Sequence, residues 1–208
     1  MANPILVEVT RGNRVESRHR GAIAVFDADG RCVGSAGDID EPVYPRSAVK
    51  AIQALPLVES GAADAFGYGD RELALAQASH GGEPDHVAVA AAMLHAAGLD
   101  ESALRCGAQW PTHNASAAAL RAAGEKPSAL HNNCSGKHAG FLAVASHNGF
   151  PADGYIDPDH PLQQMVREVM ESLTGAAHTA DRRGIDGCSI PTYAAPLAAL
   201  ATGFARFG

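Results

Sequence analysis

The sequence predicts a mixed α/β fold of the α+β type, in which short strands come first and helices follow. Two apolar segments near the N-terminus are rich in β-branched residues, whereas alanine-rich segments with helical spacing occupy most of the rest. Aromatic residues make up only 5% of the 208 residues, and glycine and alanine are abundant, which favours closely packed helices over a β-sandwich. The length permits a sizeable core.

Three strands are expected before residue 36. The first is 5–9, with β-branched residues in partial alternation. The second is the apolar run 22–26, which leads into Asp27-Ala28-Asp29-Gly30, a strong hairpin signal. The returning strand is then 31–35.

Apolar spacing and capping residues predict seven helices after the strands. We expect Pro56 to kink or end the first of them, and Asp70 and Asn114 to cap the second and the fourth. The expected helices are 46–59, 70–79, 83–97, 114–124, 135–148, 162–173 and 195–207. Neither a repeat nor a linker divides them, so we expect a single domain over 1–208.

The formal net charge of −7, with no basic run to offset it, argues against nucleic acid as a partner. Proline, glycine or charge interrupts every apolar stretch before it reaches membrane-spanning length. The first residues, Met1 to Glu8, lack the pattern of a signal peptide, so we expect a cytoplasmic protein with reduced thiols. The four cysteines are then core residues, metal ligands or reactive thiols rather than a disulfide framework. They are Cys32, Cys106, Cys134 and Cys188.

Ser47 and Lys50 form a Ser-x-x-Lys motif at the start of an apolar, alanine-rich segment. Three residues is just under one helical turn, so both side chains would share one face of a helix. A lysine amine with a lowered pKa can accept the hydroxyl proton and turn serine into a nucleophile. The motif also arises by chance, with the serine as a helix cap and the lysine in solvent.

A second serine, Ser79, lies where a helix runs into the sequence His80-Gly81-Gly82. Two glycines let backbone approach a small ligand closely, so a site with two serines is reasonable beside Ser47. The simpler interpretation is a helix end with a glycine stop. His80 is a candidate base, although such a histidine is more often a capping or surface residue.

The densest polar cluster, 131–138, precedes an apolar helix and contains Cys134, while Cys188 lies in a second glycine-rich turn, 184–191. Two thiolates from separate turns can hold a soft metal such as zinc, which usually takes four ligands. The spacing matches no familiar zinc finger, and two buried free cysteines are the alternative. The groups available to complete a zinc site are Lys137, His138, Asp186 and water.

Together, four segments resemble the successive signatures of the asparaginase II family, typified by the inducible rhizobial enzyme and distinct from the bacterial type I/II and Ntn-hydrolase asparaginases. These segments are 45–50, 78–80, 132–138 and 186–188. The resemblance implies hydrolysis of L-asparagine to L-aspartate and ammonia. It also implies a fold like that of serine β-lactamases and penicillin-binding proteins, with a helical region packed on an antiparallel sheet.

The resemblance implies a role for each matching residue. Ser47 would be the nucleophile or its immediate partner, Lys50 its base, and Ser79 the second active-site serine. The residues implied for substrate binding are Arg46, His80 and Asp186, and those implied for zinc are Cys134, Lys137 and Cys188. Burial and the charge of the metal would keep the amine of a lysine ligand neutral. We also expect a homodimer.

Members of the family continue past Gly208, where a second lysine pairs with the serine that matches Ser79. No lysine follows Lys137 in this sequence, so we expect Ser79 to lack its amine, the sheet to be incomplete, and the 208-residue chain to be poorly soluble or inactive. Two alternatives remain. One is a glutaminase or penicillin-recognising serine hydrolase of the same architecture. The other is a non-enzymatic, zinc-stabilised binding protein in which Ser47 only caps a helix.

Overall fold

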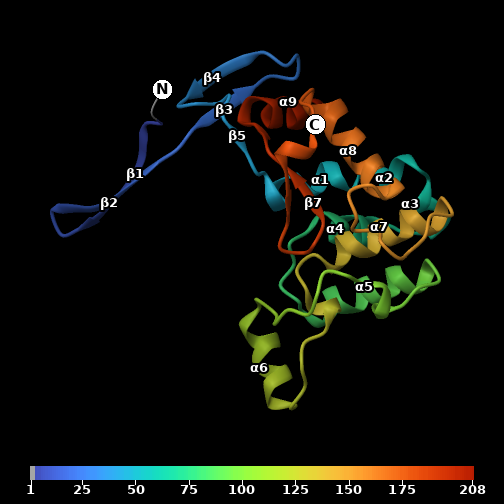
Figure 1. Cartoon of the computed structure of the whole chain (residues 1–208). Coiled ribbons are helices and arrows are strands. Elements are labelled where there is room, and N and C mark those ends of the chain that lie inside the picture. The colour runs from blue at the N-terminus through green and yellow to red at the C-terminus, as the bar shows by residue number, and fades with distance from the viewer. Residues whose placement is uncertain (1–2) are drawn as a thin grey trace. The chain divides into compact units, whose positions relative to one another are not determined.

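The computed structural model describes residues 3–208, in which helices and short strands are mixed (Figure 1). The strands are β1 Ile5–Arg11, β2 Arg14–Arg20, β3 Ile23–Phe26, β4 Cys32–Ala36, β5 Pro42–Val43, β6 Arg183–Ile185, β7 Pro191–Tyr193 and β8 Ala195–Pro196. The α-helices are α1 Lys50–Gln53, α2 Leu55–Glu59, α3 Ala62–Ala65, α4 Asp70–Gln77, α5 Pro84–Ala96, α6 Asn114–Ala122, α7 Ser135–His147, α8 Pro161–Thr174 and α9 Leu197–Phe207. The 3₁₀-helices are η1 Arg46–Val49, η2 Glu101–Ala103, η3 Ala129–His131 and η4 Ala180–Arg182.

The mixed α/β class is therefore confirmed. Within the described residues the strands pair two by two, as β1–β2, β3–β4, β5–β8 and β6–β7. The likeness to serine β-lactamases stays a prediction. None of the helices in the described part of the chain is long and apolar enough to cross a membrane.

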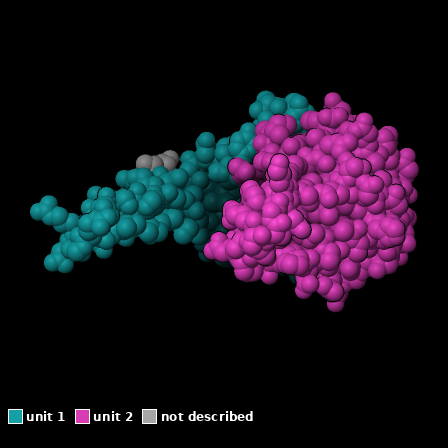
Figure 2. All heavy atoms as spheres, turned by 90° about the horizontal axis from the view of Figure 1, so that it is seen from below, with its two compact units in different colours: residues 1–45, 170–183, 193–208 teal, residues 46–169, 184–192 magenta. Residues whose placement is uncertain are grey.

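The chain divides into two compact units (Figure 2). Unit 1 comprises Met1–Pro45, Met170–Arg183 and Tyr193–Gly208, and unit 2 comprises Arg46–Val169 and Gly184–Thr192. The predicted site residues all belong to unit 2, since they lie between Arg46 and Cys188 and outside the segment 170–183.

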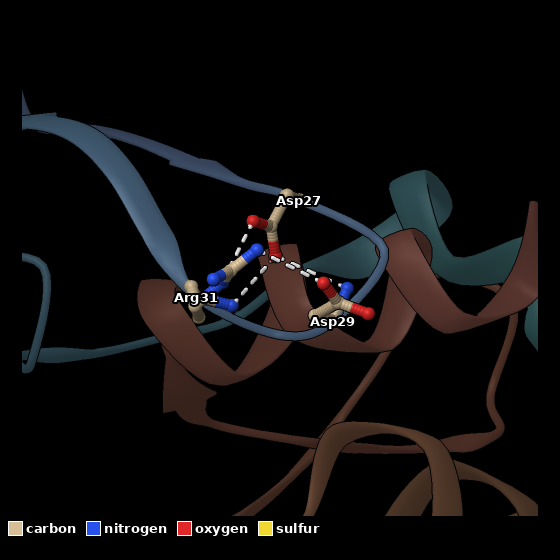
Figure 3. A network of polar contacts seen from close by, with 3 residues as sticks. All are labelled: Asp27, Asp29 and Arg31. Carbon is tan, nitrogen blue, oxygen red and sulfur yellow. Dashed lines mark hydrogen bonds and ion pairs between the residues drawn. The ribbon is translucent and has the colours of Figure 1, made fainter.

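Unit 1 contains two hairpins. The turn between β3 and β4 is held by Asp27, whose Oδ1 accepts hydrogen bonds from the N–H groups of Asp29 at 3.1 Å and Arg31 at 2.9 Å (Figure 3). The Arg31 guanidinium also bonds both carboxylates, at 3.1 and 2.9 Å. Because these groups are largely exposed, the ion pairs add little stability, and the turn is fixed mainly by its backbone bonds and by Gly30 at φ +77°.

The core of unit 2 is built around α7, which is buried continuously from Ser135 to Ala145 and packs against α2, α3, α4 and α5. A helix buried on every side needs small residues where its neighbours approach closely. Gly136 shows this need, since a Cβ built there would lie 2.5 Å from the carbonyl oxygen of Leu75 on α4. The sequence Ser-Gly-Lys-His at the start of α7 thus places polar side chains deep in unit 2, beside the turn between β6 and β7.

The prediction of one helix over 46–59 is wrong. The segment is a 3₁₀ turn followed by two short helices that meet at Ala54. Pro56 lies in the first turn of α2, and because proline has no N–H it cannot donate to the carbonyl of Ile52 and continue α1.

The other helices match the expected segments, with small differences at their ends. Asp70 and Asn114 are the first helical residues rather than the caps, which are Gly69 and His113. The strand β2, whose sequence alternates charged and polar residues, was not predicted.

Candidate functional site

A polar pocket of about 180 Å³ in unit 2 brings together residues from distant parts of the sequence. Five predicted site residues line it, namely Arg46, Ser47, Cys134, Asp186 and Cys188. They come from η1, from the N-terminal end of α7 and from the turn between β6 and β7. The pocket is below the range of about 300–1,000 Å³ that is usual for drug-sized ligands, so it suits a molecule as small as one amino acid.

An ion pair of Arg46 and Asp186 forms one wall of this pocket. Arg46 Nε and one terminal nitrogen lie 3.0 and 2.9 Å from Asp186 Oδ1. The Gly187 N–H also donates to this oxygen, at 2.8 Å. The carboxylate is only 7% exposed, but the side chain of Arg46 is 64% exposed. Because an ion pair with an exposed partner adds little stability, the main effect of this pair is to place a positive and a negative charge on the pocket wall.

Backbone strain is concentrated around the same pocket. Arg46 at φ +51° and Ser189 at φ +76° are the non-glycine residues with positive φ in the described chain. This region disfavours residues with a Cβ, and such strain persists where surrounding structure enforces it, often at functional sites. Arg46 immediately precedes Ser47, and Ser189 immediately follows Cys188.

Lys50 is 1% exposed, and its Nζ donates to the carbonyl oxygens of Ala78 at 2.7 Å and Asn133 at 3.4 Å. It also lies 2.9 Å from Ser79 Oγ. Burial lowers the pKa of Lys50 from 10.5, and the thiol of Cys134 opposes this shift. In this arrangement the amine donates to three oxygens, those of Ala78, Asn133 and Ser79.

The structure thus gives Lys50 a different neighbour from the expected one. No hydrogen bond joins Ser47 to Lys50 among the described residues, although η1, which contains Ser47, runs directly into α1 at Lys50. The second lysine that the resemblance pairs with Ser79 is absent from the sequence, and the Lys50 amine lies 2.9 Å from Ser79 Oγ. Ser47 is exposed on the pocket wall instead.

His80 is buried, at 4% exposure, and both of its ring nitrogens bond protein groups. Nδ1 accepts from the Gly82 N–H at 3.1 Å. Nε2 lies 2.9 Å from Ser135 Oγ, whose hydrogen points to the Leu130 carbonyl, so Nε2 carries the ring proton and donates it. Burial first, and then the nearby His86 ring, lower the pKa of His80 to about 4. The ring is neutral and fixes the turn after Ser79; a substrate contact from it stays a prediction.

Two thiols and an amine meet at the inner end of the pocket. Lys137 Nζ lies 3.3 Å from Cys188 Sγ, and the thiols of Cys134 and Cys188 interact with each other. The Cys188 hydrogen bond, against the opposing effect of burial, lowers the pKa of Cys134 to about 6, and the same contact raises that of Cys188 to about 11. The pair therefore holds one thiolate near neutral pH, and Asp186 Oδ2 lies 3.9 Å from Cys188 Sγ.

No three His, Cys, Asp or Glu side chains gather into a metal site within residues 3–208. A zinc site at this place needs the Lys137 amine as the third protein ligand. The donor types fit, because thiolate sulfur and a neutral nitrogen are ligands that zinc accepts.

The sequence did not single out Gln109, Asn132 or Asn133 as site residues, although all three line the pocket. The Asn132 amide donates to the carbonyls of Cys106 at 2.8 Å and Gly107 at 3.0 Å, and its Oδ1 accepts from the Cys134 N–H at 2.9 Å. It thereby fixes the start of α7. Gln109 comes from a loop with no periodic pattern, and we find no sequence signal that marks it.

Comparison with known proteins gives one family. The family model described as L-asparaginase II matches residues 7–208, which is nearly the whole chain and includes every residue of the pocket. No curated protein matches the chain.

Proposed function

The chain belongs to the L-asparaginase II family, and on this premise we propose that it hydrolyses the side-chain amide of L-asparagine to L-aspartate and ammonia. The observation that carries the proposal is the small polar pocket, which has a cation, an anion and a serine on its walls. The buried Lys50 amine reaches both the exposed Ser79 and the carbonyl of the pocket residue Asn133.

The pocket suits a zwitterionic amino acid. The Arg46 guanidinium supplies positive charge for the α-carboxylate, and Asp186 supplies negative charge for the α-ammonium group. Both charges are already held in place by their mutual bonds and by the Gly187 N–H, so little ordering is needed on binding.

We assign the nucleophile to Ser47, which lies on the pocket wall, and the proton acceptor to Lys50 with Ser79. Ser47 lies in η1 and Lys50 follows directly as the first residue of α1, so the two are separated by about one turn of the chain. Ser47 Oγ forms a bond to the amide carbon, and its proton passes to the Lys50–Ser79 pair. The C–N bond then breaks, the leaving nitrogen takes that proton as ammonia forms, and water hydrolyses the aspartyl ester. Backbone N–H groups at the helix starts stabilise the oxyanion.

We further propose that Cys134, Lys137 and Cys188 hold one zinc ion. Bound zinc would act as a Lewis acid that orients a polar group of the substrate, beside its structural role. The lowered pKa of Cys134 supports this assignment, because the thiolate is the form that binds metal. Elemental analysis should find one zinc per chain in the wild type and less in Cys134→Ser.

The function is tested by ammonia release from asparagine and by intact mass after rapid quenching. Ser47→Ala, Lys50→Met and Ser79→Ala should each lower kcat by at least about 100-fold, the usual order for a positioned proton-transfer group. Ser102→Ala is the matched control, because Ser102 is exposed in η2 and lies outside the pocket. An aspartyl-ester mass that persists in Ser47→Ala but not in Ser79→Ala would move the nucleophile to Ser79.

The same assay separates the alternatives. Glutamine is one methylene longer than asparagine, which typically changes discrimination by about 1–3 kcal/mol in a closed pocket. Faster release from glutamine would indicate a glutaminase, and turnover of a chromogenic β-lactam would indicate a penicillin-recognising enzyme. Zinc binding without any turnover would favour a non-enzymatic binding protein.

A further inference from the structure

Gln109 lines the polar pocket from the loop between η2 and α6, and no step proposed above uses it. The loop is held on both sides of this residue. Two positions before it, the carbonyl of Gly107 accepts a hydrogen bond from Asn132 Nδ2 at 3.0 Å. Directly after it, the ring of Trp110 lies 4.5 Å from the guanidinium carbon of Arg121, a cation–π contact. Because Gln109 is anchored in this way, little ordering is needed when a substrate binds.

One hydrogen bond sets the orientation of the half-buried Gln109 carboxamide. Its Oε1 accepts from the backbone N–H of Asn133 at 3.4 Å. A backbone N–H can only donate, so the oxygen of the carboxamide faces Asn133, and the nitrogen with its two hydrogens lies on the other side of the group. Gln109 Nε2 has no acceptor among residues 3–208. Two N–H donors are therefore left for a molecule in the pocket.

The same contact links Gln109 to the proposed proton-transfer groups. The carbonyl oxygen of Asn133 accepts from the His80 N–H at 3.2 Å and from Lys50 Nζ at 3.4 Å. The Lys50 amine in turn lies 2.9 Å from Ser79 Oγ. The backbone of Asn133 thus fixes the Gln109 donor and the Lys50 amine relative to each other.

The chemistry of asparagine decides which of its groups this donor suits. Asparagine has two kinds of strong acceptor, the α-carboxylate and the carbonyl oxygen of the side-chain amide. The proposed function gives the α-carboxylate to the Arg46 guanidinium, which leaves the side-chain carbonyl for Gln109. This oxygen becomes negatively charged when Ser47 Oγ adds to the amide carbon. A fixed N–H therefore bonds it more strongly in the transition state than in the bound substrate.

We propose that Gln109 Nε2 donates a hydrogen bond to the side-chain carbonyl oxygen of the substrate and stabilises the oxyanion, beside the backbone N–H groups. This inference rests on the asparagine hydrolysis proposed above. A carboxamide does not titrate, so the donor is present at every pH at which the enzyme works. Loss of one such donor lowers kcat by about 100- to 1,000-fold in other acyl-transfer enzymes.

The test is the steady-state rate of ammonia release from asparagine by the full chain and by two variants of this residue. Gln109→Glu keeps an oxygen for the Asn133 N–H but replaces the donor with a second acceptor. Gln109→Met has similar length and removes both functions without adding charge. The matched control is Gln164→Met, because Gln164 is exposed on α8 in unit 2 and its carboxamide donates to the carbonyl of Asp159 at 3.3 Å.

Both Gln109 variants should lower kcat by at least about 100-fold, and in Gln109→Met the KM should stay within about threefold of the wild type. Gln164→Met should match the wild type. A loss in Gln109→Met alone would mean that the residue only supports Asn133, and a higher KM at unchanged kcat would move the donor to the α-carboxylate. Either result, or wild-type kcat in both variants, overturns the proposal and leaves asparagine hydrolysis standing. A wild-type chain that releases no ammonia overturns both.

Discussion

At the scale of single residues, Lys50 shows the largest difference between the neighbours that its local sequence predicts and those that it has. The Ser-x-x-Lys motif predicted a pair within one turn, but the buried amine lies against Ser79 and two carbonyls. Local spacing shows which residues share a helix face, whereas the partner of a buried amine depends on which other segments pack there. The motif residues Ser47, Ser79, Cys134 and Cys188 could be proposed from the sequence because their side-chain chemistry is visible there, whereas the positive φ of Arg46 could not be predicted.

His80 gives a pH-dependent prediction at the same scale. Its folded-state pKa of about 4 lies below the ordinary 6.5, so between these values the unfolded chain binds a proton that the folded chain does not. The free energy of unfolding should therefore be largest above about pH 6.5 and fall with decreasing pH. The contribution of this one ring is about 1.4 kcal/mol per pH unit. Urea unfolding from pH 4.5 to 7.5 measures the slope.

His80→Gln isolates this contribution. The variant should lose about 1–3 kcal/mol at pH 7.5, because the Gly82 N–H or the Ser135 hydroxyl loses a buried partner. Its pH slope should be smaller than that of the wild type, since the other ionisable groups cancel in the difference. His95→Gln, on the exposed side of α5, should retain the wild-type slope. A His80→Gln profile parallel to the wild type would contradict the assignment of a buried neutral ring.

At the scale of elements, the spacing of apolar residues predicted the longer helices well. The segments that became α5, α7 and α8 were predicted to within a residue or two of each end. The prediction of one helix over 46–59 failed at its start, where η1 begins at a residue with positive φ. The expected break at Pro56 was correct, since α1 ends before it and Pro56 lies in the first turn of α2. The strand β2 pairs with β1 but contains few apolar residues, so its sequence shows no alternation of apolar and polar residues that would predict a strand.

The close contact between α4 and α7 gives a prediction for Gly136. A Cβ at this position would meet the Leu75 carbonyl oxygen at 2.5 Å and the Leu75 Cγ at 2.6 Å, so Gly136→Ala must push α7 away from α4. We expect a loss of about 2–3 kcal/mol in the free energy of unfolding, typical of overpacking in a core. Since Lys137 follows directly, zinc affinity should fall as well. Thermal and urea unfolding measure the first effect.

Gly140 is the control for that substitution, one turn further along the same helix. Its Cβ would lie 3.3 Å from Leu57 Cδ2, the movable end of a side chain, and 3.5 Å from Ala76 Cβ. Alanine also favours helix over glycine by up to about 1 kcal/mol. Gly140→Ala should therefore be near neutral. If both variants are equally stable, the contact at Gly136 does not limit the approach of the two helices.

At the scale of the whole molecule, the candidate site and the exposed hairpin of β1 and β2 lie in different units. The pocket and the thiols of Cys134 and Cys188 lie in unit 2, whose core surrounds α7. The hairpin of β1 and β2 lies in unit 1 and is exposed along its whole length. An isolated two-stranded hairpin is at best marginally stable in water. This hairpin therefore has apolar surface available for another partner.

The apolar side chains of that hairpin are Ile5, Leu6, Val7, Val9 and Val15, which are 38–53% exposed. The hairpin also carries four arginines and two glutamates, whereas the chain as a whole has a net charge of −7. A basic, apolar ribbon suits an acidic partner surface, and the expected homodimer would supply one. We predict that the purified chain has twice the 21.4 kDa mass of one chain in light scattering.

The substitution that tests this prediction is Val7→Arg with Val9→Arg, which places two charges on one face of β1. Because both side chains are already about half exposed, the fold should be retained, and circular dichroism should be unchanged. The mass should fall to that of one chain, since burying an unpaired charge in an interface costs several kcal/mol. Val33→Arg is the control, because Val33 on β4 is 63% exposed and lies outside this hairpin. A double variant that stays dimeric would place the interface elsewhere, and a wild-type chain with the mass of a monomer would refute the dimer itself.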